Sequence, residues 1–223
     1  MKMLSKKIAV LLIVALSAGL LGGCGPQFDA AAYVKALLDN SYKNDSKAFV
    51  EQKLGTAEEA AEIYNQGLEH AISDILIDEE NEGFSVSEDL LKEYRTTFET
   101  IFSKVNYTVG EAEKQEDGSY MVTVTYETMD VFANAMSDYD ERVAEWTESL
   151  SADVIAGEEF PEEEELYNTL FELLKDCIND AVSNVGYSAP QEMTIKVELS
   201  DGVYSPNQSD IEALEYNLLG LYK

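Results

Sequence analysis

The chain is poor in the residues that most enzymes use for catalysis. Its 223 residues include one histidine, His70, and two cysteines, Cys24 and Cys177. A Ser-His-Asp triad would have to use His70, which lies off the apolar stripe of its predicted helix. The sequence also contains no HExxH, GxSxG or Walker-type motif and no Cys/His cluster with zinc spacing. We therefore predict no catalytic residues and no cofactor.

Basic residues are also scarce. The chain has 15 Lys and Arg against 44 Asp and Glu, and three of the lysines lie within the first seven residues. Without residues 1–23, the formal net charge is −32 over 200 residues. Such a field repels nucleic acid and attracts cations or basic peptides, although it can also serve only to keep the domain soluble. We expect no nucleic-acid partner.

The sequence has no apolar run long enough for an ordinary membrane-spanning helix. Its longest run, 8–21, follows Lys2, Lys6 and Lys7 and ends in small residues. A spanning helix needs about 20 apolar residues. A basic start, a shorter apolar run and small residues are typical of a secretory signal that is cleaved.

The end of this segment, Leu21-Gly22-Gly23-Cys24, resembles the bacterial lipobox. The resemblance implies a signal peptide over residues 1–23, lipid attachment at Cys24, a short tether over 24–27 and an acidic domain over 28–223. Two or more acyl chains anchor a protein stably, so we expect a location on the extracytoplasmic face of the cell membrane. The alternative is ordinary secretory cleavage near Gly23. Acylated Cys24 would leave Cys177, which shares an apolar helical stripe, without a disulfide partner.

Hydrophobic periodicity predicts several amphipathic helices and a small sheet. Apolar residues recur at helical spacing in 32–42, 49–54, 61–75, 91–105, 132–150, 166–185 and 211–221, and alternate in 107–109, 120–126 and 193–199. Helix starts are predicted at Asp29, at a Thr56/Glu59 capping box and at a Ser85/Glu88 capping box. This order predicts an α+β fold, with amphipathic helices packed on a small antiparallel sheet made of a hairpin and one later strand.

Two groups of residues are candidate binding sites. Tyr107, Tyr120 and Tyr126 share one face of the predicted hairpin, where tyrosines could line a ligand cleft; core packing is the commoner use of such a face. Asp78, Glu80, Glu82 and Asp89 occupy positions 1, 3, 5 and 12 of an EF-hand-like register and could bind calcium. Their side-chain lengths differ from the usual pattern, so a plain acidic loop is the alternative.

Several segments carry a resemblance to a known family. They are 32–39, 42–45, the hairpin strands 107–109 and 120–124, and 201–204. Together with the lipobox, their order resembles a family of uncharacterised surface lipoproteins of Gram-positive gut bacteria. The resemblance implies a small α+β domain, loosely similar to NTF2-like or cystatin-like modules, to which the long helical pair within 132–185 is an addition. It transfers no catalytic residues.

The function that we predict is non-enzymatic. We expect a membrane-anchored binding or interaction domain for a cationic or peptide partner, or a component of an envelope complex. One alternative is a small-ligand carrier with an apolar pocket between sheet and helices. The other is an acid-based glycan hydrolase, which requires two carboxylates about 5–10 Å apart across a cleft. The sequence leaves the partner and the oligomeric state open.

Overall fold

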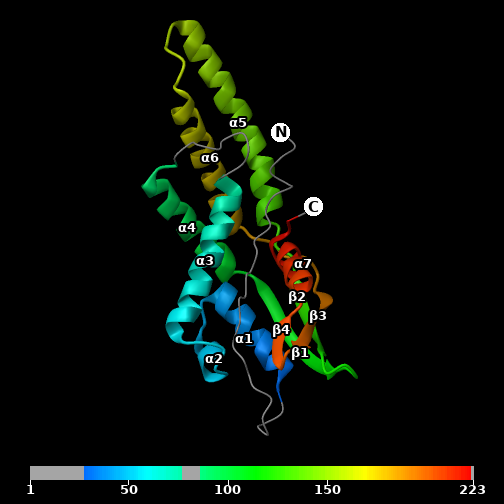
Figure 1. Cartoon of the computed structure of the whole chain (residues 1–223). Coiled ribbons are helices and arrows are strands. Elements are labelled where there is room, and N and C mark those ends of the chain that lie inside the picture. The colour runs from blue at the N-terminus through cyan, green and yellow to red at the C-terminus, as the bar shows by residue number, and fades with distance from the viewer. Residues whose placement is uncertain (1–27, 77–85, 222–223) are drawn as a thin grey trace.

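The structure is a computed structural model that describes residues 28–76 and 86–221. Its elements in chain order are α1 (Ala30–Lys43), α2 (Lys47–Glu51), α3 (Ala57–Leu76), α4 (Glu88–Ser103), β1 (Asn106–Lys114), β2 (Tyr120–Glu127), α5 (Val131–Ala156), α6 (Glu163–Ser183), β3 (Gln191–Ser200), β4 (Val203–Pro206) and α7 (Gln208–Leu219). Helices pack on an antiparallel sheet, so the predicted α+β class is confirmed (Figure 1).

The sheet has the order β1-β2-β3-β4, and each strand runs antiparallel to its neighbour. In β2 every second residue is buried, which places Tyr120, Val122, Val124 and Tyr126 on the core face. The strand β4 adds to the three strands that the sequence predicted. It pairs with the end of β3 because Asp201 and Gly202 both adopt positive φ angles, as a tight hairpin turn requires.

The helices α1 and α7 both contact the sheet, and α3 and α4 contact α1 from other sides. Ten of the fourteen residues of α1 are buried, which makes it the central helix of the core. We refer to residues 28–76, 86–135 and 171–221 as the body. None of the helices in the described part of the chain is both long and apolar enough to cross a membrane.

Two of the three predicted helix starts are confirmed by hydrogen bonds. The Asp29 carboxylate accepts a bond from the Ala32 amide, and Thr56 and Glu59 exchange side-chain bonds with each other's amides. The predicted box at Ser85 is wrong. The N-cap of α4 is Ser87, whose hydroxyl accepts a bond from the Leu90 amide, and Ser85 itself lies outside the described residues.

Candidate functional site

The distal parts of α5 and α6 project from the body as a two-helix arm. We define the arm as residues 136–170, and no side chain in this range is buried. Figure 1 shows the two helices running side by side beyond the other elements, with the loop that joins them at one end of the molecule. At 1.5 Å per residue, the 26 residues of α5 extend about 39 Å.

The arm is held together by a narrow apolar seam. Val143, Trp146 and Leu150 of α5, and Leu166 and Leu170 of α6, are all only partly buried. At the tip, Gly157 ends α5 with a φ of 103°, a value that favours glycine. Three consecutive glutamates, 163–165, occupy the first turn of α6, where the positive end of the helix dipole stabilises them. At its base, Met136, Tyr139 and Tyr167 also pack partly against the core, whereas the rest of the hairpin depends on these local signals.

Large apolar side chains remain exposed at the tip of the arm. Ile155 is 87% exposed and Phe160 is 63% exposed, and Val154 beside them is also exposed. Phe160 lies in the loop between the helices, four residues after the last alanine of α5. Single exposed apolar residues are common, but a group at the end of a projecting element is typical of an interaction surface.

The arm is also strongly acidic. Its 35 residues contain twelve Asp and Glu and one base, Arg142, and the segment 151–170 contains seven acids and no base. Arg142 is paired with Asp180 of the body side of α6. The arm therefore presents a nearly uncompensated negative charge around its apolar tip.

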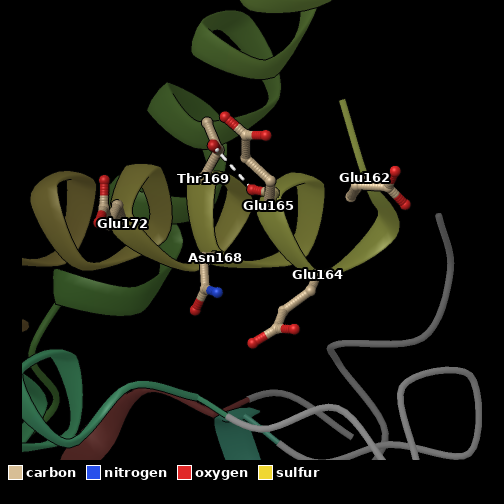
Figure 2. Close-up of a pocket in the computed structure, with 6 residues that line it drawn as sticks. All are labelled: Glu162, Glu164, Glu165, Asn168, Thr169 and Glu172. Atoms are coloured by element: carbon tan, nitrogen blue, oxygen red, sulfur yellow. Dashed lines mark hydrogen bonds between the residues drawn. The ribbon is translucent and has the colours of Figure 1, made fainter. Parts of the chain in front are cut away.

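Figure 2 shows the acidic face of α6, where a shallow hollow of about 400 Å³ lies at the start of the helix. The lining residues are Glu162, Glu164, Glu165, Asn168, Thr169 and Glu172. The Thr169 hydroxyl donates to the backbone carbonyl of Glu165, whereas Glu164 and Asn168 point to the same side of the helix. Among the described residues, none of these glutamates forms an ion pair. Their carboxylates are thus available to basic groups on a partner.

The base of the arm is tied firmly to the body. The Tyr94 hydroxyl of α4 donates to the Phe171 carbonyl at 2.7 Å, and the Thr97 hydroxyl bonds Asn179 at 2.8 Å. Lys175, which is largely buried, pairs with Glu93 of α4. These contacts fix the direction in which the arm leaves the body.

The chain enters the body through an aromatic cluster. Phe28 stacks on Tyr204 of β4, with ring centroids 3.9 Å apart and planes 2° apart. It also contacts the rings of Tyr33 and Tyr120. The beginning of α1, which follows Phe28 directly, lies toward the end of the molecule opposite the tip of the arm (Figure 1).

The three tyrosines of the hairpin lie in the core. Tyr107, Tyr120 and Tyr126 are all buried, and the Tyr107 hydroxyl donates to the Asp39 carboxylate at 2.7 Å. Burial, followed by this hydrogen bond and the Asp39 charge, raises the pKa of Tyr107 far above its ordinary value. Tyr120 also borders a surface hollow together with Phe28. The structure thus uses this face of the hairpin mainly for packing.

Asp39 is a buried ionic group that the sequence analysis missed. Burial opposes its ionisation, but hydrogen bonds from Lys35 and Tyr107 and the charges of Lys35 and Lys43 together lower its pKa. The Lys43 ammonium also lies 4.2 Å from the centre of the Tyr107 ring. The spacing of Lys35, Asp39 and Lys43, each four residues apart on α1, is the sequence signal for this network.

The remaining predicted residues are dispersed or lie outside the described part. Cys24, Asp78, Glu80 and Glu82 fall outside the described residues. Asp89 is exposed on α4 and pairs with Lys92. Within residues 28–76 and 86–221 there is no group of three or more His, Cys, Asp or Glu residues placed to hold a metal ion.

His70 and Cys177 lie on different helices and differ in exposure. His70 is exposed on α3, whereas Cys177 is fully buried on α6, where burial raises the pKa of its thiol. A raised pKa keeps the sulfur in its less reactive thiol form.

Comparison with known proteins gives one informative similarity. No family profile and no curated protein matches the sequence. Among solved structures, the chain is similar to a candidate lipoprotein, YcdA, of Bacillus subtilis subsp. subtilis str. 168, with a TM-score of 0.53 and 16% sequence identity. The match covers 87% of this chain and 56% of the other, so this chain spans little more than half the length of YcdA. At this identity the similarity shows a shared fold.

Proposed function

We propose that this chain is a lipoprotein, anchored through Cys24 on the extracytoplasmic face of the membrane, that binds a basic polypeptide segment with its arm. The lipobox supports the anchor, and so does the similarity of the fold to that of a candidate lipoprotein. It fits the predicted membership of a surface lipoprotein family of Gram-positive bacteria. The observation that carries the binding function is the exposed pair Ile155 and Phe160 within the acidic arm.

The position of the proposed anchor implies that the arm points away from the membrane. Only three residues lie between Cys24 and Phe28, so the four steps from one Cα to the other span at most about 14 Å when fully extended. The aromatic cluster at Phe28 therefore lies close to the lipid, while the tip of the arm lies toward the other end of the molecule. This arrangement presents the tip away from the bilayer, toward other components of the envelope.

The chemistry of the arm supports a partner that is both basic and partly apolar. Exposed apolar side chains bind apolar anchors, and the surrounding carboxylates attract Lys and Arg and repel acidic chains. A basic segment with apolar residues on one side, such as an amphipathic helix, meets both requirements. We propose binding rather than catalysis, because the arm presents exposed apolar side chains surrounded by carboxylates.

A binding measurement with a defined probe tests this function. The probe is a fluorescent synthetic helix with leucine on one face and lysine on the other, and its glutamate counterpart is the negative control. The double variant Ile155→Ser/Phe160→Ser should weaken binding of the lysine probe by about tenfold or more, because central apolar contacts dominate such interfaces. Added salt should weaken binding further, since the charges are exposed.

Leu199→Ser is the matched control, because Leu199 is an exposed apolar residue of the body. This variant should bind the probe as the wild type does. Equal binding by the wild type and the double variant would contradict the proposal, and so would a loss of binding in Leu199→Ser alone.

A further inference from the structure

The buried side of α7 contains a glutamate among its apolar residues. Ile211, Leu214, Leu218 and Leu219 face the core, and Glu215 lies on the same side with 1% of its surface exposed. Neither of its carboxylate oxygens has a hydrogen-bond partner. A buried carboxylate without a partner is costly, so it indicates a group that is completed by something else.

Two further oxygens without partners belong to the same region. The Tyr42 ring of α1 packs against Phe102 and Tyr107, but its hydroxyl, which is fully buried, forms no hydrogen bond. The buried Oδ2 atom of Asp74 on α3 is also unpaired. Electrostatic interaction links the three groups, since Glu215 acts on Tyr42 and Asp74 acts on Glu215.

The helices α1, α3 and α7 therefore place four oxygen atoms that form no hydrogen bond in one part of the interior. No lysine or arginine of the described residues forms an ion pair with Asp74 or Glu215. The charges that act on these two groups are the exposed His70, which acts on Asp74, and a further acid, Glu212, which acts on Glu215. A small cation bound between the two carboxylates would offset their negative charge.

The donor set identifies the class of cation. All four atoms are oxygens, from two carboxylates and one hydroxyl, and hard cations prefer oxygen ligands. Calcium takes about 6–8 oxygen ligands in flexible geometry, so four protein oxygens and water can complete its shell. We propose that Asp74, Glu215 and the Tyr42 hydroxyl form an internal site for a hard divalent cation, with calcium as the test ion.

This site differs from the loop register predicted from the sequence. It lies in the body, between α1, α3 and α7, and shares no residue with Asp78, Glu80, Glu82 and Asp89. It is also separate from the arm. A cation there would join the last helix to the two helices that contain Tyr42 and Asp74, and would stabilise the body.

Thermal unfolding of the chelator-treated protein with and without millimolar calcium tests the site. Calcium should raise the Tm of the wild type by about 5 °C or more, since a ligand that binds only the folded state stabilises it. Glu215→Gln should abolish the shift, because an amide replaces the carboxylate with nearly the same shape. Asp89→Asn, which changes the predicted loop, should keep it.

Terbium luminescence gives a second readout on the same proteins. Terbium replaces calcium and is excited through a nearby tyrosine, so Tyr42→Phe should reduce the tyrosine-sensitised signal, and it serves as the second variant if Glu215→Gln fails to fold. Absence of any calcium shift in the wild type would overturn the site, as would a shift that Glu215→Gln retains. Loss of the shift in Asp89→Asn alone would assign calcium to the loop. Binding of the lysine probe to the arm is measured separately, so failure of one proposal is distinguishable from failure of the other.

Discussion

The body and the arm are built from the same kind of amphipathic helix but differ in what the apolar face contacts. In α1 ten of fourteen residues are buried, whereas in the arm no side chain among 35 residues is buried. The body buries its helices against a sheet and one another, while the arm has a two-helix seam and, at its base, Met136, Tyr139 and Tyr167 packed partly against the core. The comparison shows that helical patterning fixes the shape of a segment and that tertiary contacts fix its stability.

The arm and the body also differ in where their acidic residues lie. The arm has a net charge of −11 in 35 residues, and its acids lie in solvent where they repel one another weakly. The body contains fewer acids per residue, but Asp39 and Glu215 are buried there, and their environments shift their pKa values in opposite directions. Solvated charge suits recognition, whereas buried charge controls stability.

The largest expected difference comes from truncating the same residue type in the two regions. Leu68 of α3 is fully buried, and Leu150 of the arm is only partly buried. Leu68→Ala should lower the free energy of unfolding by about 2–5 kcal/mol, because it leaves a cavity. Leu150→Ala should lower it by less than about 1 kcal/mol. Urea unfolding followed by circular dichroism measures both, and equal losses would show that the arm unfolds as part of the core.

A smaller difference is expected when a buried glutamate of the body and an exposed glutamate of the arm are each replaced by glutamine. The variants are Glu215→Gln and, as the matched control, Glu163→Gln, and their Tm values are compared with that of the wild type in calcium-free buffer. Burial raises the pKa of Glu215, so the folded protein keeps a proton that the unfolded chain releases above its ordinary value of 4.5. Stability from this group is present at low pH and is lost as the pH rises.

Because glutamine does not titrate, Glu215→Gln should raise the Tm at pH 8, by about 2–4 °C for each kcal/mol of stability gained. The gain should disappear as the pH approaches 4.5. Glu163→Gln should change the Tm little at any pH, since Glu163 is exposed. A pH profile of Tm for the three proteins checks this, and a gain that does not depend on pH would refute the buried-acid explanation.

The smallest difference is expected in the free energy of unfolding that is lost when one ion pair of each region is removed. Arg142 in the arm pairs with Asp180 while both are well exposed, whereas Lys175 at the base of the arm is largely buried beside Glu93. Arg142→Gln should cost less than about 0.5 kcal/mol, as exposed pairs usually do. Lys175→Gln should cost about 1 kcal/mol more, because it also removes packing of the lysine stem. Chemical unfolding at low and high salt measures both costs; a larger loss for Arg142→Gln would reverse the ranking of the two regions.

Much of the fold was predictable because its signals are local. The helix starts at Asp29 and Thr56 follow from side chains that bond amides within one turn, and the alternation in β2 follows from the two-residue period of a strand. The start of α4 was misplaced because Ser85 and Ser87 both satisfy the N-cap preference. The strand β4 was missed because four residues give too short a pattern.

The candidate sites were less predictable than the fold. The hairpin tyrosines shared a face as expected, but whether that face lines a cleft depends on what packs against it, and here α1 does so. Glu215 lies four residues after Ile211 and was hidden within an apolar stripe. The exposed tip was missed because Ile155 and Phe160 look like core residues in sequence.

The sequence by itself determined the resemblance of residues 21–24 to a lipobox, the acidic charge and most helices and strands, because each depends on residues near one another in the chain. Only the tertiary structure decided that the α5–α6 pair projects as an arm while α1, with a similar pattern, is buried. It also decided that Asp74, Glu215 and Tyr42 share one part of the core. The physical reason is that burial depends on which faces meet, and these faces belong to segments distant in the sequence.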